Sequence, residues 1–288
     1  MNYYIKRVIL ALTGWIPDKP YLQITYLLRM KECLRLKNPR YMSEKTQWLK
    51  IYDYKPEYAQ MADKVAVRKF VTDRLGKDCL IKQYGVYSKA EDIPYDELPD
   101  RFVLKCSHDS ASTVVVKDKS KLNRKKTNDF LNKRLRLKFY LEGRENVYKE
   151  VAPQIVCEEF IGEGDCVPED YKVFCFGGEP QFIQLDANRF QKNHVQNFYD
   201  AKWNRLPMDS DYPNNENYEK DKPQRLDEML HYARILSKGL RFVRTDFFIV
   251  KNKIYFGEIT FYPGAGFKRW TPVEMDLKYA AMINTDSI

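Results

Sequence analysis

Residues 244–266 read RTDFFIVKNKIYFGEITFYPGAG, with runs of alternating polar and apolar side chains on either side of a KNK triplet. A period of two predicts two antiparallel strands joined by those three residues. This register places Asp246 directly opposite Glu258, and Arg244 opposite Thr260. Two carboxylates in such a position lie roughly 4.5–5.5 Å apart at Cβ and repel each other. The hairpin therefore needs a positive partner between its acids, unless the register differs or both acids face water.

A divalent cation is the partner that suits this hairpin. Carboxylate oxygens on rigid strands are ligands that Mg²⁺ prefers, and nucleotide phosphates can complete its octahedral shell. Arg244, on the same face, would then offset negative charge that develops on a transferred phosphate. Thr260 would add a hydroxyl beside Glu258. The hairpin predicts a metal site formed by Asp246, Glu258 and Thr260.

A second segment is suited to binding phosphates. The apolar run RFVLKC reads as a strand that ends near Lys105, and a loop of small polar residues follows it. Backbone N–H groups in such a loop, together with an ammonium, bind phosphate oxygens. Lys64 is a second candidate cation. The loop residues expected at the phosphates are Ser107, His108, Ser110 and Ser112.

A third segment, PQIVCEEFI, reads as an apolar strand that ends in two acids. An acid and exposed backbone at a strand end can hydrogen-bond an adenine amino group and ribose hydroxyls. Each of these segments also has an ordinary interpretation, as a solvated lysine or a plain strand end, and none is decisive alone.

Composition limits the classes of protein to consider. The chain has 288 residues, 44% hydrophobic and 31% charged, as in ordinary globular proteins. The net charge of +9 favours anionic partners, but the basic residues are scattered and nucleic acid is not expected. Six cysteines without a C-x-x-C pair indicate reduced thiols and a cytoplasmic protein. The start, MNYYIKRVILALTGWIP, is interpreted as a first core helix or a segment lying on a membrane surface.

Helices come first along the chain and strands later. Helical spacing and caps predict three helices within residues 21–76, and strand-like runs begin after Pro99. This order lacks the regular alternation of a parallel doubly wound sheet, so we expect an α+β fold. We divide the chain into a helical N-terminal region and two α+β units, at residues 1–62, 63–162 and 163–288.

Taken in order, these segments resemble the ATP-grasp superfamily. The runs NPRYMSEKTQWLKIYD, LPDRFVLKCSHDS, DYKVFCFGGEPQFI and NFYDAKWNRLP resemble, more specifically, the teichuronopeptide-type (TupA-like) ATP-grasp proteins of bacterial surface-polysaccharide gene clusters. The similarity covers nearly the whole chain. It implies an ATP-grasp fold in which two α+β subdomains hold ATP and Mg²⁺ between them, after a helical N-terminal region. It also implies an ATP-dependent ligase that joins a carboxylate to an amine through an acyl phosphate.

The resemblance assigns roles by position. Lys64 and Lys105 would bind phosphates, Arg244 would stabilise the transition state, and Lys172 would lie near the phosphates or the acyl group. The metal ligands would be those of the hairpin. The residues implied at the adenine and ribose are Glu158, Glu159, Phe160, Ile161, and Asp165 or Asp170.

Two positions depart from the superfamily pattern. Thr260 stands where many ATP-grasp ligases carry Asn. The phosphate loop SHDSAS lacks the glycines that are common at this point. Asp109 within it would repel ATP unless its side chain points away or chelates a cation.

The polysaccharide setting implies a sugar uronate as the carboxylate and an amino acid or amino alcohol as the amine, or the reverse. Peripheral contact with membrane polysaccharide machinery would fit this setting. Two alternatives stay open: a kinase for sugar hydroxyls on the same scaffold, and a glycosyltransferase in which Asp246 serves the metal of a nucleotide sugar. The side chains expected to face the acceptor are Arg189, Asn193, His194 and Tyr199.

Overall fold

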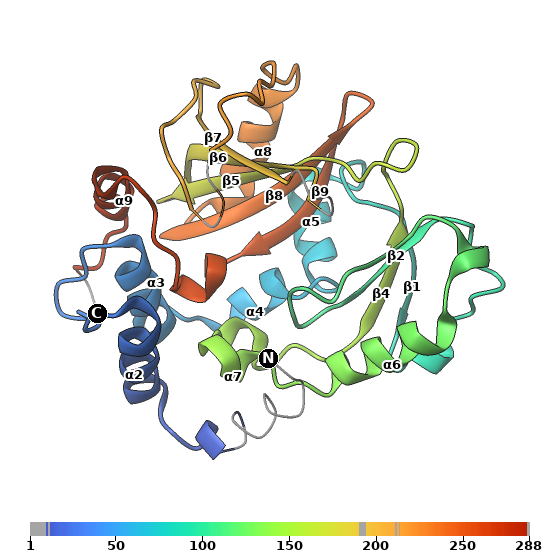
Figure 1. The fold of residues 1–288 in the computed structure, drawn as a ribbon, viewed down its shortest axis with the longest axis horizontal. Coiled ribbons are helices and arrows are strands. Elements are labelled where there is room, and N and C mark those ends of the chain that lie inside the picture. Colours follow the sequence, from blue (N-terminus) through green and yellow to red (C-terminus); the bar gives the residue numbers. More distant parts are fainter. Residues whose placement is uncertain (1–9, 11, 190–193, 211, 213, 287–288) are drawn as a thin grey trace.

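Two antiparallel sheets organise the chain (Figure 1). The expected core helix or membrane-surface segment at the start falls largely outside the residues that the structure describes. The computed structural model describes the chain apart from residues 1–9, 11, 190–193, 211, 213 and 287–288.

The first sheet has the strand order β1-β4-β2-β3. Alternate residues of β2, such as Phe102 and Leu104, are fully buried against helix α6 (Arg124–Leu135), whereas Val103 and Lys105 face the other way. This alternation explains why the short run RFVLKC forms a half-buried strand. The strands are β1 (Gln83–Tyr87), β2 (Phe102–Cys106), β3 (Val114–Val116) and β4 (Ile155–Glu159).

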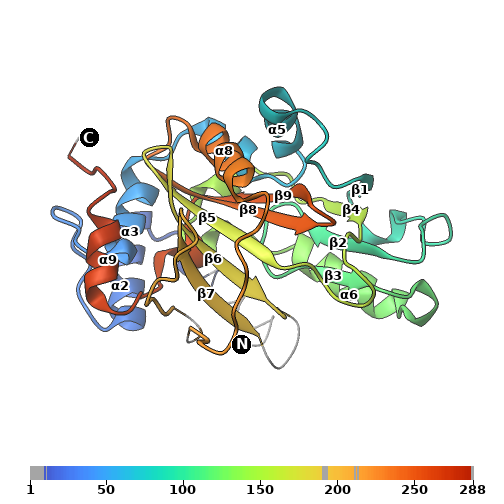
Figure 2. The same ribbon diagram turned by 90° about the horizontal axis from the view of Figure 1, so that it is seen from above.

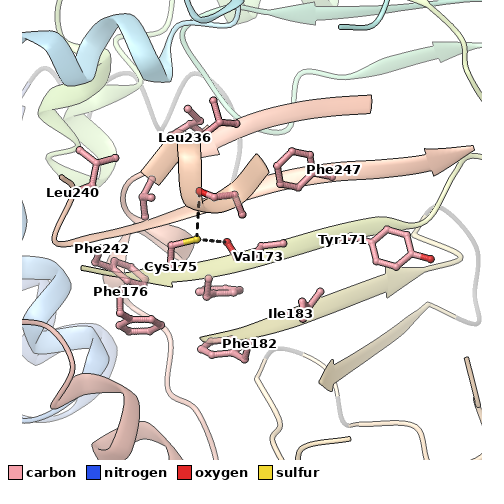
Figure 3. Close-up of a cluster of buried hydrophobic side chains, with 14 of the residues drawn as sticks. Tyr171, Val173, Cys175, Phe176, Phe182, Ile183, Leu236, Leu240, Phe242 and Phe247 are labelled. Atoms are coloured by element: carbon pink, nitrogen blue, oxygen red, sulfur yellow. Dashed lines mark hydrogen bonds between the residues drawn. The ribbon is translucent and has the colours of Figure 1, made fainter. Parts of the chain in front are cut away.

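The second sheet is larger, with the order β7-β6-β5-β8-β9. One of its faces packs on helix α8 (Leu226–Ser237), where Val173, Cys175 and Ile183 join the apolar cluster of Figure 3. The Cys175 thiol lies there within hydrogen-bonding range of the Val173 and Ala233 carbonyl oxygens. The strands are β5 (Asp170–Phe176), β6 (Glu179–Ala187), β7 (Val195–Asp200), β8 (Phe242–Val250) and β9 (Lys253–Thr260).

The opposite face of this sheet is polar across four neighbouring strands. Glu258 of β9 pairs with Asp246 of β8, which pairs with Lys172 of β5, which pairs with Gln184 of β6. Directly paired residues share a face, so these four side chains form one row. A buried row of charged and amide groups is costly for a core, and its presence marks this face for a ligand.

The hairpin β8–β9 contains the expected pairs, Asp246 with Glu258 and Arg244 with Thr260. The expected three-residue loop is wrong. The turn contains only Lys251 and Asn252, both with positive φ, as in the tight turns that favour hairpins. One extra residue at Gly257 forms a bulge between the turn and the acids. The short turn and the bulge cancel, which restores the register that the longer loop would have produced.

Helices surround the two sheets on several sides (Figure 2). Helix α5 packs against α8, and its Val67 and Val71 belong to the core of the second sheet. Ser43 lies inside α3 (Met42–Tyr52), and Glu44 in the first turn of this helix accepts from the backbone N–H of Arg40. The remaining helices are α2 (Asp18–Met30), α3 (Met42–Tyr52), α4 (Pro56–Ala62), α5 (Val67–Leu75), α7 (Tyr140–Gly143) and α9 (Val273–Ala280), with short 3-10 turns η1 (Ala90–Asp92), η2 (Lys119–Lys121), η3 (Asn146–Tyr148) and η4 (Pro263–Gly266).

Among the residues that the structure describes, no helix combines the length and the apolar character that a bilayer span requires.

Candidate active site

A cavity of about 370 Å³ opens between the two sheets. This volume is within the range of small-molecule sites. Strands β2 and β4 contribute from the first sheet, β5, β8 and β9 from the second, together with the loop after β2. The residues predicted from the sequence that line the cavity are Lys64, Lys105, Ser110, Glu158, Glu159, Phe160, Ile161, Asp170, Arg189, Asp246 and Glu258.

Two lysines reach this cavity, and each is held by a hydrogen-bonding partner. The Lys105 ammonium nitrogen lies 2.5 Å from a carboxylate oxygen of Glu158 on the neighbouring strand. The Lys64 ammonium donates to the backbone oxygen of Asp109 at 2.6 Å. An ammonium has three N–H donors, so one bond to the protein leaves capacity for an anionic ligand. The pair can therefore bind phosphate oxygens without a large rearrangement.

The acids of the hairpin are bridged by a guanidinium. Arg244 donates from Nε and Nη2 to the two oxygens of Asp246, each at 2.6 Å. Its Nη2 also lies 3.1 Å from Glu258 Oε1 and 3.1 Å from the hydroxyl of Thr260. A two-point bond of this kind is strong and fixes the geometry of both groups. Arg244 is thus the positive partner that the facing carboxylates require.

The protein shifts the pKa values of the two carboxylates in opposite directions. Burial raises the pKa of Asp246 to about 6, against the lowering effect of Arg244. Burial acts in the same direction on Glu258, but the cations Lys64 and Arg244, with others nearby, hold the pKa of Glu258 at about 2. Glu258 is therefore ionised at neutral pH even without a bound ligand.

This arrangement fits a hard divalent cation. Two carboxylates and a hydroxyl, those of Asp246, Glu258 and Thr260, converge from adjacent strands. Within the described residues, no group of three or more His, Cys, Asp or Glu side chains is arranged around a metal position. Mg²⁺ is commonly bound by one or two carboxylates, with phosphate and water oxygens filling its remaining positions.

A second polar cluster continues from the cavity onto β6. Lys172 is buried between Asp170, at 3.7 Å, and Asp186, with which it forms an ion pair. Burial lowers the pKa of Lys172 to about 8 despite the neighbouring Asp170. Arg189 lines the cavity and donates to Asp170 at 2.9 Å. The His194 ring nitrogen lies 3.4 Å from Asp186.

Comparison with known proteins identifies the family. A family model described as TupA-like ATPgrasp matches residues 44–284. The chain belongs to the TupA-like ATP-grasp family. Membership confirms the ATP-grasp fold and the class of ATP-dependent ligases that the sequence implied. ATP and Mg²⁺, the expected cofactors, are those of this class.

Several solved structures are similar to this TupA-like protein at low sequence identity. D-alanine–D-alanine ligase from Helicobacter pylori is 17% identical over 84% of this chain and 68% of its own, with a TM-score of 0.45. The enzyme of that name from Bacillus anthracis, complexed with ATP, is 12% identical over 85% and 69%, with a TM-score of 0.41. An ADP complex of N5-carboxyaminoimidazole ribonucleotide synthetase is 12% identical over 75% and 49%, with a TM-score of 0.42. No curated protein matches the sequence.

The phosphate loop of this TupA-like protein is built differently from the expectation. Only Ser110 of its four predicted residues lines the cavity. Ser107 donates to the backbone oxygen of Ala152 at 2.7 Å, and the ring of His108 contacts the backbone oxygen of Leu137 at 3.3 Å. Ser112 is also buried, where it accepts from the N–H of Cys106. These three side chains fix the loop to the protein instead of facing the cavity.

The expected repulsion between Asp109 and phosphate is avoided because its carboxylate points away. Asp109 accepts from Arg134 at 2.6 Å and from the Ser112 hydroxyl at 2.5 Å. The loop reaches the left-handed conformation at Ala111, with a φ of 62°, at a point where a glycine would be the usual residue. This loop therefore has a fixed carboxylate, and an alanine in the left-handed conformation, where a glycine-rich sequence is the usual one.

The remaining predicted residues have varied placements. Arg244 and Thr260 lie behind the cavity wall and reach it through Asp246 and Glu258, and Lys172 lies beside Asp170. Asp165 is exposed and does not line the cavity. Tyr199 is in the core, stacked on Trp203 with ring centres 4.1 Å apart. Asn193 lies outside the described residues.

Sequence reasoning missed two sets of site residues in this TupA-like protein. Asp186 pairs directly with Asp170 across the hairpin that contains GGEP, but a bulge beside Phe174 and Cys175 shifts this register by one residue, so turn length alone would not have found the pair. Apolar wall residues lie two positions from polar site residues on the same strand, as Val103 does from Lys105, and the strand period of two was the available signal that they share a face. The apolar lining consists of Ile81, Val103, Val115, Val167, Pro168 and Phe248.

Proposed function

We propose that this protein is an ATP- and Mg²⁺-dependent carboxylate–amine ligase, with ATP bound in the cavity between the sheets. The observation that carries the proposal is the hairpin, where Asp246 and Glu258 face Arg244 beside a cavity that also receives Lys64 and Lys105. The acids are suited to a cation and the basic groups to phosphates.

The lining supports one orientation of the nucleotide. The apolar walls around Val103 and Phe248 suit a purine ring, and the strand end at Glu159–Ile161 offers backbone groups to its edge. Lys64, Lys105 and the loop at Ser110 suit the phosphates. Asp246, Glu258 and Thr260 would hold Mg²⁺, which supplies positive charge between phosphate oxygens.

The proposed reaction has two balanced steps. A carboxylate oxygen of the substrate bonds to the γ-phosphorus of ATP, the bond to the bridging oxygen breaks, and ADP leaves. An amine nitrogen then bonds to the acyl carbon, phosphate departs with the electron pair of the C–O bond, and the nitrogen loses a proton to solvent or a base. Arg244 offsets negative charge in the first step, and Lys172 lies one strand away for the acyl group.

The charged cluster beside the cavity supports two substrates of opposite charge, a carboxylate and an ammonium. Arg189 and Lys172 can attract a carboxylate, whereas Asp170 and Asp186 can attract an ammonium. With the polysaccharide setting of the family resemblance, we propose a sugar uronate and an amino acid or amino alcohol as the two substrates, in either order. We place the reaction in the cytoplasm, where ATP is available, beside membrane machinery that builds surface polysaccharide.

The test is ADP release with a panel of uronates and amines, with products identified by mass. A product mass equal to the two substrates less one water is expected, in a reaction that needs Mg²⁺. Asp246→Asn and Glu258→Gln should each lower ADP release by roughly 100-fold or more. Glu179→Gln, a surface acid at the far hairpin turn, should leave it unchanged.

Two results would contradict the ligase. ADP release without any amine, with phosphate found on a sugar hydroxyl, would show a kinase. Thermal stabilisation by UDP-sugars but not by ATP with Mg²⁺ would indicate a glycosyltransferase instead.

A further inference from the structure

The N-terminal region carries an apolar surface that the ligase reaction does not use. Five of the nine exposed large hydrophobic side chains in the described part of the chain fall between residues 12 and 28. Trp15 is 79% exposed and Leu28 is 63% exposed. We call these five residues the N-terminal patch: Leu12, Trp15, Ile24, Leu27 and Leu28.

Helical geometry explains how the patch arises on α2. Leu22, Tyr26 and Met30 recur every four residues and are buried against the body of the protein. Ile24, Leu27 and Leu28 fall on the other side of the helix and are exposed. A surface helix normally has a single apolar stripe, and the outward side is polar. Helix α2 has two apolar stripes. The inward stripe packs on the protein, and the outward stripe is available for a second apolar environment.

The patch lies at an outer edge of the molecule, away from the cavity. Figures 1 and 2 both place α2 at the opposite end from α6, and Figure 1 shows α3 between α2 and the large sheet. No residue of α2 lines the cavity. A ligand of the patch would therefore not block the nucleotide site.

The segment that contains the patch has more basic than acidic residues. Residues 12–40 contain six Lys or Arg residues but only two acids, Asp18 and Glu32. Both acids are neutralised within the protein, Asp18 by Arg144 at 3.6 Å and Glu32 by Arg269 at 2.9 Å. The basic residues at the exposed surface here include Lys19, Lys31 and Lys37. An exposed apolar stripe in a segment with exposed lysines suits the interface of an anionic bilayer, where apolar side chains enter the acyl boundary and lysines contact headgroups.

We propose that the N-terminal patch docks this enzyme on the surface of a membrane rich in anionic lipids. Helix α2 lies in the plane of the interface, and Ile24, Leu27 and Leu28 enter the acyl boundary. Trp15 takes the headgroup level, where tryptophan is enriched. The cavity, at the other side of α3, stays open to the cytoplasm. The docking holds the enzyme beside lipid-linked or membrane-assembled acceptors, and it does not depend on the ligase chemistry being correct.

The chain contains an internal probe for the test. Of its four tryptophans, Trp48, Trp203 and Trp270 are buried, and Trp15 is exposed. With vesicles of phosphatidylcholine and phosphatidylglycerol, we expect the protein to sediment with the lipid and its tryptophan emission to shift to shorter wavelength. Pure phosphatidylcholine vesicles should bind far less, and added salt should weaken binding to the anionic ones.

Paired variants distinguish binding through the N-terminal patch from nonspecific hydrophobic binding to lipid. Ile24→Ser with Leu28→Ser should lower vesicle partitioning by roughly ten-fold or more, since two apolar side chains leave the interface. Phe130→Ser removes an exposed aromatic on α6, at the opposite end, and should change nothing. Circular dichroism and the urea midpoint should match the wild type, since both serines replace exposed side chains. ADP release with soluble substrates should also be unchanged.

Three outcomes would overturn the docking proposal. One is partitioning that is equal for both lipid compositions, or absent. Another is an unchanged partitioning of the double serine variant. The third is a concentration-dependent dimer that the double variant dissolves, which would assign the patch to a second copy of the chain.

Discussion

Neutralising the two facing carboxylates one at a time, as Asp246→Asn and Glu258→Gln, is expected to change stability in opposite directions. The substitutions are chemically equivalent, and the residues pair directly across β8 and β9. The difference lies in their surroundings. Asp246 is buried with a pKa raised to about 6, whereas nearby cations lower the pKa of Glu258 to about 2.

The magnitudes follow from these shifts. At neutral pH, ionised Asp246 costs about 3 kcal/mol relative to its usual pKa of 3.8, at about 1.4 kcal/mol per pKa unit. Asparagine removes that cost but accepts only one of the two bonds from Arg244, a loss of about 1–2 kcal/mol. The net expectation for Asp246→Asn is a gain of about 1 kcal/mol. The Glu258 side chain is 37% exposed, so screening limits the loss in Glu258→Gln to about 1 kcal/mol.

The measurement is urea unfolding of both variants at neutral pH, without nucleotide. The pH dependence supplies an internal check for Asp246. Its folded-state pKa lies above the unfolded value, so wild-type stability falls as the pH rises from about 4 through about 6, and the Asn variant lacks this fall. The advantage of the Asn variant should therefore disappear near pH 4. For Glu258, whose folded-state pKa is lowered, the stabilising contribution persists above pH 4.5 and is lost only as the pH falls towards about 2.

Shifts of the same sign in the two variants would refute this account of the hairpin. An Asn advantage that does not vary with pH would refute it equally, because the gain would then not come from the ionisation of Asp246.

Two further changes test a buried lysine that bonds to the segment after β9, and the bulge within the hairpin. Lys50 is buried and donates to the backbone oxygens of Gly143 and Ala265, each at 2.6 Å, so Lys50→Met should destabilise the fold by about 2–4 kcal/mol; an unfolding midpoint within error of the wild type would contradict this. A Cβ at Gly257 would lie 3.0 Å from the backbone oxygen of Asp246, so Gly257→Val should displace the acids and lower ADP release by roughly 10–100-fold. Turnover equal to the wild type in that variant would show that the bulge does not position the site.

Local alternation was enough to predict which hairpin residues share a face, because the side-chain period of a strand is a property of adjacent residues, whereas the pairs themselves came from the assumed three-residue loop. It did not reveal that a shorter turn and the bulge at Gly257 compensate, since each alone would move Asp246 to another partner. It was harder still to predict which side chains of the expected phosphate loop face the cavity. Whether Ser107 points inward or outward depends on Ala152, 45 residues further along the chain. Such contacts form only once the sheet has assembled, and no local pattern encodes them.

The contacts of Arg244 link the stability of the hairpin to its capacity for ligands. Both oxygens of Asp246 accept from Arg244, and Glu258 and Thr260 share its Nη2. If the Asp246 carboxylate rotated to direct an oxygen towards a cation, the two-point geometry would be lost and one guanidinium N–H would lose its acceptor. That N–H would need another partner, because an unpaired buried donor is costly. In the proposed reaction, phosphate oxygens that arrive with the cation would be the acceptors at hand, and the release of Arg244 from Asp246 would accompany its approach to phosphate. The same guanidinium that allows two carboxylates to face each other would in this way reach the group that reacts.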